Sequence, residues 1–184
     1  AGNVSVDSGT IKLDGNYPTG TNNVVMGSGA GANIVSGGNN NTVLGYNSGN
    51  AISTGDKNTA LGVGSYQSGT TASINTAVGY NAGFAVTTGI ENTLIGGLAG
   101  DALTDADYNV AVGKEALTAM TLGSRNVAVG TFTLMSANVT SAANTYNTAV
   151  GHHAGANVTT GSNNTFVGGL AGDAITTSNS NTAI

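Results

Sequence analysis

A five-residue motif recurs at nearly constant spacing through most of this chain of 184 residues. The motif reads Asn, then Thr or Val, then two apolar residues and Gly, and successive copies start 18, 17, 17, 17, 17, 17, 21, 17 and 17 residues apart. The copies start at Asn23, Asn41, Asn58, Asn75, Asn92, Asn109, Asn126, Asn147, Asn164 and Asn181. The last copy breaks off at Ile184, before its Gly. This period constrains the fold more than any other feature, because it is typical of proteins that stack one structural unit per repeat.

Seventeen residues are too few for the helix pairs of ankyrin or tetratricopeptide repeats, which need more than about 30 residues. They suit one coil of a β-solenoid, with two short strands and two turns. Val, Ile and Thr favour strands, whereas Gly and Asn accept positive φ at the corners. We therefore predict an all-β fold: a parallel β-solenoid (β-roll) whose coils, about ten in number, stack about 4.8 Å apart.

The positions of the repeat, numbered from its Asn as position 1, have distinct compositions. The Asn of position 1 is expected to pair amide to amide along the solenoid axis, and the Gly of position 5 to end the first strand. Position 8 is always Ala, Ser or Thr, and position 12 is mostly apolar. The predicted structural ladder consists of Asn41, Asn58, Asn75, Asn92, Asn109, Asn126, Asn147 and Asn164, with Gly45, Gly62, Gly79, Gly96, Gly113, Gly130, Gly151 and Gly168.

The strand residues of the repeat are apolar, or nearly so, on both sides. Positions 2 and 4 share one face of a strand and position 3 occupies the other, because successive side chains alternate. Strands of this kind are typically buried on both faces, and a continuous apolar stripe over ten coils exceeds what single soluble chains expose. We expect self-association about the long axis, with position 3 or position 4 facing the partner chains and closed cyclic symmetry as the usual outcome. Composition alone does not choose three chains over two.

Composition argues against several classes of protein. Only 7% of the residues are charged, against about 25% in typical soluble domains, yet Val, Ile and Thr are too abundant and too regularly placed for a disordered chain. No apolar run approaches the roughly 18 residues of a membrane helix, so membrane insertion is not expected. The net charge is −5, and Lys and Arg together number four and are scattered, which argues against nucleic acid as a partner. The chain has no Cys, and no cofactor is expected.

Several segments resemble repeats of known fibre proteins. Asn75-Thr-Ala-Val-Gly-Tyr-Asn-Ala-Gly83, Asn147-Thr-Ala-Val-Gly-His-His-Ala-Gly155 and the Thr-Thr-Gly linkers resemble repeats in bacteriophage tail fibres, especially those of marine and cyanobacterial phages. They are also similar, more loosely, to the Asn-x-x-Ala-Ile-Gly repeats in the β-roll heads of trimeric autotransporter adhesins. The resemblance covers residues 11–184 and implies a homotrimer, an elongated rod and a surface-binding role. The period here is longer than the adhesin repeat, and no receptor-binding residue carries over.

The chain divides into two parts. Residues 1–22 precede the repeat and are expected to form a cap or a transition segment, with short strands at Val4–Val6 and Thr10–Leu13. Residues 23–184 form the repeat domain, which we expect to continue beyond Ile184, because an uncapped coil exposes unpaired backbone. One repeat is four residues longer than the others, and we expect its Ser136–Thr145 segment to form a surface loop. That loop is the best candidate for a local specificity feature, although a tolerated insertion is the favoured interpretation.

Candidate chemical sites are few. His152 and His153 are the only histidines, and as neighbours in an extended segment they should point to opposite sides, which is poor for shared metal binding within one chain. Symmetry could still gather copies of one His at an axis, but exposed surface positions are favoured. Asp101, Asp105 and Asp107 are the other candidate metal ligands; they lack the spacing of a calcium loop, so turn-capping carboxylates are favoured. No nucleophile, phosphate loop or carboxylate pair indicates an enzyme.

These observations favour a structural and adhesive role. We expect a homotrimeric fibre shaft of a phage tail fibre that takes part in host attachment, located in the virion or otherwise at a cell surface. A host-surface glycan or protein is the candidate receptor, and Tyr46, Tyr80 and Tyr108 are candidates for stacking on sugars, although packing on neighbours is favoured. A bacterial trimeric adhesin is the nearest alternative. An ice-binding solenoid is another, although the Thr file of position 2 is expected to be buried, and a polysaccharide-cleaving tailspike is the enzyme alternative.

Overall fold

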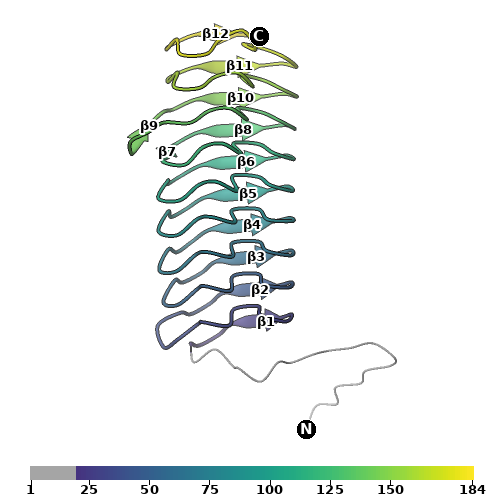
Figure 1. Cartoon of the computed structure of the whole chain (residues 1–184), viewed down its shortest axis with the longest axis vertical. Coiled ribbons are helices and arrows are strands. Elements are labelled where there is room, and N and C mark those ends of the chain that lie inside the picture. Colours follow the sequence, from purple (N-terminus) through teal and green to yellow (C-terminus); the bar gives the residue numbers. More distant parts are fainter. Residues whose placement is uncertain (1–19) are drawn as a thin grey trace, which may run out of the picture.

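The computed structural model describes residues 20–184, which form a single stack of coils (Figure 1). The predicted all-β parallel β-solenoid with a period of about 17 residues is confirmed. Residues 1–19, where the two short N-terminal strands were expected, lie outside the described part. The strands are β1 (Val24–Met26), β2 (Thr42–Leu44), β3 (Thr59–Leu61), β4 (Thr76–Val78), β5 (Thr93–Ile95), β6 (Val110–Val112), β7 (Gly123–Ser124), β8 (Val127–Val129), β9 (Ala143–Asn144), β10 (Thr148–Val150), β11 (Thr165–Val167) and β12 (Thr182–Ala183).

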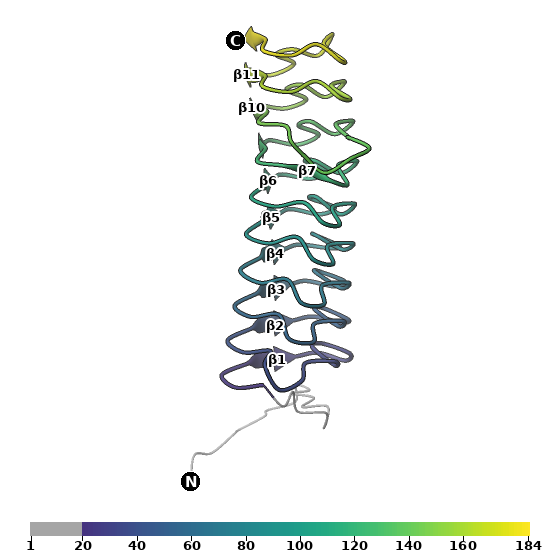
Figure 2. The ribbon, with the colours of Figure 1, turned by 90° about the vertical axis from the view of Figure 1, so that its left-hand side faces the viewer.

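Ten of these strands form one parallel sheet in the order β1-β2-β3-β4-β5-β6-β8-β10-β11-β12. Each strand pairs with the same repeat positions of the next, so that Thr42 lies beside Thr59 and Thr59 beside Thr76. The sheet stands along one side of the stack, with the turns of each coil opposite (Figure 2). Identical chemistry therefore recurs at every level of the sheet, about 4.8 Å apart.

The prediction of two strands in each coil is wrong for all but two coils, those of β6 and β8, which also contain β7 and β9. Each coil contributes one strand of two or three residues to this sheet, and the backbone from position 6 to position 11 runs as consecutive turns. The reason is visible in the backbone angles: positions 7 and 9 both adopt positive φ, as at Asn47 (51°) and Gly49 (50°) in the coil of β2. Two left-handed residues so close together prevent an extended segment.

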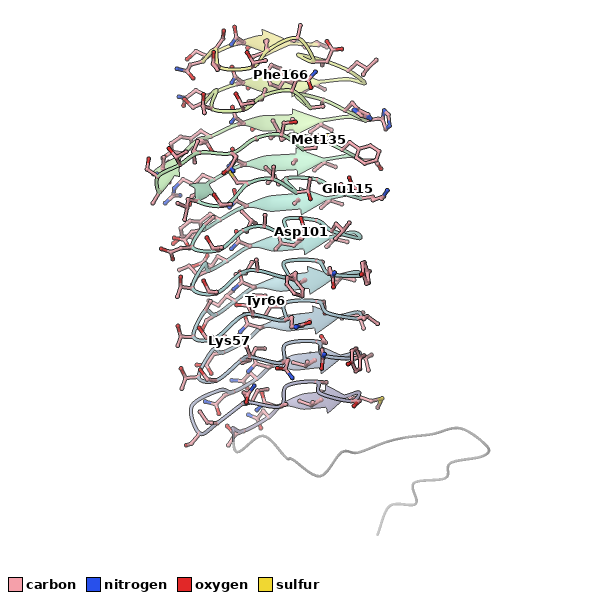
Figure 3. The ribbon with its side chains drawn as sticks, viewed as in Figure 1. Lys57, Tyr66, Asp101, Glu115, Met135 and Phe166 are labelled. Carbon is pink, nitrogen blue, oxygen red and sulfur yellow. The ribbon has the colours of Figure 1, made fainter. Side chains whose placement is uncertain are left out.

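The interior of the solenoid is filled from position 3 and from the turns. The position 3 side chains point inward and those described within the stack from Val43 to Phe166 are fully buried. Positions 8, 9 and 12 face them, and residues such as Ile52, Leu103 and Val158 at position 12 are also fully buried. A narrow apolar column therefore runs the length of the stack, and Phe166 lies within it near the last coils (Figure 3).

Large and small side chains alternate between positions 3 and 9 of this column. Coils with Ala at position 3 can carry a large buried residue at position 9, as Ala60 does with Tyr66 and Ala111 with Leu117. Coils with a large residue at position 3 have Gly at position 9: Leu94 is matched by Gly100, where an added Cβ would lie 2.8 Å from a methyl carbon of Leu94. Where both positions are small, as at Ala77 with Gly83, a large residue of the next coil occupies the space: an added Cβ on Gly83 would lie 2.7 Å from a methyl carbon of Leu94.

The Gly of position 5 is required for two separate reasons. Gly79 has φ of 134°, a conformation that side chains rarely adopt, and an added Cβ would lie 2.6 Å from the carbonyl oxygen of Gly96 in the next coil. The same geometry recurs from Gly45 to Gly151. This is where the chain leaves the sheet, and stacked glycines let the coils approach to hydrogen-bonding distance there.

Candidate interaction surface

The Asn ladder runs inside the molecule, where each Asn bonds within its own coil and to its neighbours. The buried Asn109 accepts hydrogen bonds at Oδ1 from the backbone N–H (3.0 Å) and the side-chain amide (3.1 Å) of Asn126. Its own amide nitrogen donates to the carbonyl of Gly123 across the coil (3.0 Å) and to Oδ1 of Asn92 (3.2 Å). The side chain thus closes its coil and links it to the coils on both sides.

In the longest repeat, a Thr hydroxyl takes the place of one side-chain amide of the ladder, and the ladder stays continuous. Four extra residues separate Asn126 from Asn147, and the hydroxyl of Thr145 donates to Oδ1 of Asn126 at 2.7 Å. The backbone N–H of Asn147 still donates to the same oxygen, at 3.1 Å. A second, simpler ladder at position 13 links neighbouring coils, where the hydroxyl of Thr87 donates to the carbonyl of Thr104 (3.3 Å). The ladder Asn and Gly residues therefore have structural roles.

Positions 2 and 4 form an outer face of the sheet that is open in the single chain. Position 4 contains only aliphatic residues and Met, and several are substantially exposed, among them Leu44 (40%), Ile95 (38%) and Val167 (42%). Position 2 is Thr or Val, from Val24 (60% exposed) to Thr182. Neither position carries a charge in any coil. With ten strands about 4.8 Å apart, this outer face is about 45 Å tall and about 10 Å wide.

The expectation that the Thr of position 2 is buried is wrong for the single chain. Position 3, which has the smaller side chains, points into the coil, and positions 2 and 4 point away from it. The narrow interior has room for only one of the two sets of strand side chains. Position 3 supplies that set, and its side chain is small in every coil whose position 9 side chain is large. Position 3 or position 4 was expected to face partner chains. Because position 3 is buried inside the coil, only the side chains of position 4 can make such contacts.

Two exposed files flank the outer face, one on each side. The entry file is position 17, the residue just before the Asn; it includes Ile74 (51% exposed), Tyr108 (38%) and Tyr146 (51%). The exit file is position 6, just after the Gly; it includes Tyr46 (58%) and Tyr80 (60%). The side chain of Lys57 marks the entry side in Figure 3.

The entry file has an unexpected backbone conformation. Every described residue of this file has positive φ, from 50° to 64°, although the file contains Ile74, Glu91, Tyr108 and Arg125 besides Asn. Asn and Gly are the residues that usually occupy corners with positive φ. The conformation at the other residues is imposed by the coil, because the N–H of most entry residues donates to a carbonyl of the preceding coil, as that of Ile74 does to Asp56 (2.9 Å).

His152 and His153 lie side by side, contrary to the sequence expectation. Their ring centroids are 4.3 Å apart, and Phe132 of the preceding coil packs against both, 4.9 Å from His153. The expectation of opposite directions fails because these residues belong to a turn: His153 has φ of 57°, so the alternation of an extended strand does not apply. Within residues 20–184, no group of three or more His, Cys, Asp or Glu side chains is placed to hold a metal ion.

The three candidate aspartates bond to neighbouring coils. Asp101 accepts from the hydroxyl of Thr118 (2.6 Å), and Asp105 accepts from that of Thr88 (2.6 Å). Asp107 accepts from the backbone N–H of Ile90 (2.8 Å), as a turn-capping carboxylate does. Burial raises the pKa of Asp101, and its hydrogen bond from Thr118 opposes that rise.

The long repeat forms a lateral projection on the entry side of the stack. There β9 pairs in parallel with β7 in a separate two-stranded sheet (Figure 1). An open hollow beside it is lined by Asp105, Asp107, Ser124, Ala142, Ala143 and Asn144. Arg125 donates to Oδ1 of Asn144 (3.1 Å) and lies over the ring of Tyr108 at 4.5 Å, so that this Tyr packs on a neighbour.

Within residues 20–184 no helix has the length and apolar character needed to cross a membrane. A comparison with models of protein families, with curated proteins and with solved structures gave no match.

Proposed function

We propose that this chain is a segment of a fibre shaft, built from three copies that associate side by side through their outer faces. The shaft is that of a phage tail fibre, spacing an attachment tip from the virion and contributing to contact with the host surface. A bacterial trimeric surface adhesin is the nearest alternative, and the flanking sequence separates the two: a baseplate-attachment domain supports the first and a membrane anchor the second.

The observation that carries this proposal is the uncharged outer face. A stripe of Thr, Val, Leu and Ile about 45 Å tall and about 10 Å wide covers about 450 Å², which equals the largest apolar patches of single soluble chains, and such patches are often interaction surfaces. Stable protein interfaces bury about 800 Å² per partner, and the outer face with its entry and exit files offers an area of that order. The flat, repeating surface and the fully bonded interior suit a stiff rod better than a site for chemistry.

A charge placed on the outer face tests the proposal. Val112 lies at position 4 in the middle of the stack, and in a cyclic assembly Val112→Lys brings like charges together in an apolar contact. We expect sedimentation equilibrium to give three times the chain mass for the parent and one chain mass for the variant, with the β circular dichroism retained. Thr160→Lys, on an exposed turn, is the matched control and should remain a trimer. A parent with the mass of one chain overturns the proposal.

Ice binding is a second candidate, supported by the exposure of the Thr file. Position 2 offers exposed Thr42 and Thr165 and partly exposed Thr residues between them, in register along a flat sheet. The bulky aliphatic file of position 4 beside them favours the fibre. A measurement of thermal hysteresis, the difference between the melting and freezing temperatures, distinguishes the two functions. Hysteresis that disappears in Thr76→Lys would support ice binding, and its absence in the parent would exclude ice binding.

A further inference from the structure

The turn that follows each strand brings the side chains of positions 6 and 7 together. Every described residue at position 7 has positive φ, from 50° to 72°. A left-handed residue interrupts the alternation of an extended strand, so consecutive side chains need not point to opposite sides. In the coil of β6 they meet: Nζ of Lys114 lies 3.1 Å from Oε1 of Glu115, which is labelled in Figure 3. The turn therefore places two consecutive side chains within contact of each other.

In the coil of β10 this turn carries the only two histidines of the chain. The ring centroids of His152 and His153 are 4.3 Å apart, and the ring planes are inclined at 64°. The ring of Phe132, from the preceding coil, packs on both, with its centroid 4.9 Å from that of His153 and 6.2 Å from that of His152. The backbone N–H of His153 donates to the carbonyl of Thr131 (3.0 Å), which fixes the turn on the preceding coil. The fold itself therefore holds the two imidazoles together.

The ring nitrogens of both histidines are available to a ligand. Within residues 20–184, no hydrogen bond involves a ring nitrogen of either side chain. His152 is exposed and His153 is half-buried, so the pair is open to solvent, and rotation of the His152 ring can direct a nitrogen toward an ion bound by His153. Lys114, which contacts the ring of Phe132 (5.1 Å), is paired with Glu115, so its charge is balanced. Neutral imidazole is the commonest metal ligand among side chains.

The spacing of the two rings indicates which kind of ion fits. A metal–nitrogen bond to imidazole is about 2.0–2.1 Å long, so the ion lies about 3.2 Å from the centroid of each ring that binds it. Two such centroids are about 4.5 Å apart when the bonds meet at a right angle, and about 5.2 Å apart at a tetrahedral angle. The observed 4.3 Å is close to the first value. Right-angled nitrogen ligands are typical of tetragonal Cu²⁺ and Ni²⁺, and Cu²⁺ binds most tightly among the divalent ions of its row.

We propose that His152 and His153 form a chelating site for one Cu²⁺ ion, with water at the remaining coordination positions. The site is complete within one chain, so it is independent of the proposed side-by-side association. Because the second imidazole binds intramolecularly, the pair should hold the ion about a hundredfold more tightly than one imidazole does. This reverses the sequence expectation, in which the two rings point apart and only symmetry could gather copies of one His.

Titration of the untagged chain with Cu²⁺ alone, followed by calorimetry, tests the site. We expect one ion per chain at the strong site, and His152→Asn or His153→Asn should each weaken its binding about a hundredfold. The double variant His152→Asn/His153→Asn gives the background from all other groups. All of these substitutions are at solvent-accessible positions and should leave the β circular dichroism unchanged.

A relocated histidine provides the matched control. His153→Asn/Tyr80→His keeps two histidines but places them in different coils, those of β10 and β4, and Tyr80 is exposed. It should bind Cu²⁺ as weakly as His153→Asn, and recovery of strong binding would show that pairing in one turn is not required. Single variants that lose half of the bound copper at unchanged affinity, one ion per three chains, or a parent that binds no more tightly than the double variant would each overturn the proposal.

Discussion

A buried Asn at every level of the stack is costly unless each of its polar atoms makes a hydrogen bond, because the amide is removed from water. In this solenoid they do: within the described residues, no buried side-chain nitrogen or oxygen lacks a hydrogen bond. The amide has one acceptor and one two-proton donor on the same group, so it can bond across its own coil and along the axis at once. An ionised Asp cannot donate, and the shorter Ser has a single proton to donate, so neither can replace the Asn at position 1.

Removing one rung should therefore be costly. Asn109→Ala leaves the backbone N–H of Asn126 and the carbonyl of Gly123 without their partners, and we expect the free energy of unfolding to fall by about 3 kcal/mol. Asn157→Ala is the matched control, since Asn157 is exposed and makes one bond, to Asp173; it should cost less than about 1 kcal/mol. Chemical denaturation at a fixed protein concentration measures both. Equal losses in the two variants would contradict the structural role of the ladder.

Tyr66 should make stability depend on alkaline pH. It is fully buried, its hydroxyl accepts from the amide of Asn75 (2.9 Å), and burial raises the pKa of Tyr66 above its usual value of about 10. The folded state then holds this proton more tightly than the unfolded state, so the contribution of Tyr66 is complete below pH 10 and is lost as the pH rises above it. Tyr66→Phe should cost about 1 kcal/mol near pH 7 and show a weaker decline above pH 10. The exposed Tyr80→Phe should follow the parent, and a Tyr66→Phe profile parallel to the parent at high pH would refute this assignment.

The coil is the element that the sequence describes best. The period, the parallel register and the closing Gly follow from the repeat because each depends on identical residues meeting at each level. The single strand of most coils could not be predicted in the same way, because positive φ at residues such as Leu98 and Leu170 contradicts their local propensity and is imposed by the stack. The direction of His152 and His153 was misjudged for the same reason. The reciprocal sizes of positions 3 and 9 are visible in the sequence, since Ala60 with Tyr66 and Leu94 with Gly100 are opposite combinations, but only the fold shows that the two positions face each other.

This reciprocity predicts a rescue within one coil. Leu94→Ala should cost about 3 kcal/mol by opening a cavity, and Gly100→Leu should cost about 2 kcal/mol by overfilling the same space. The double variant reproduces the combination of Ala111 and Leu117, and Leu117 already adopts φ of 55° at this position. We expect the double variant to lose at least about 2 kcal/mol less than the sum of the single losses. Additive losses in thermal or chemical unfolding would show that the two positions do not share one volume.

At the scale of the whole molecule, the chain is a stack with bonded levels and one apolar side. The turn side carries polar and charged residues, whereas the outer face carries none with a charge, and this asymmetry is the physical reason for the side-by-side association that we propose. End-to-end stacking is a different use of the same solenoid, and it would leave the outer face in water. Association through the outer face widens the particle while leaving the height of the solenoid stack, about 45 Å, unchanged.

Small-angle X-ray scattering of the dilute chain is the most direct test of this account, because it gives mass and dimensions together. We predict a particle with three times the 17.8 kDa mass of one chain, a larger cross-section than a single solenoid and a solenoid stack that remains about 45 Å tall. A particle with the mass of one chain, or one whose stack lengthens in proportion to its mass at constant cross-section, would contradict it.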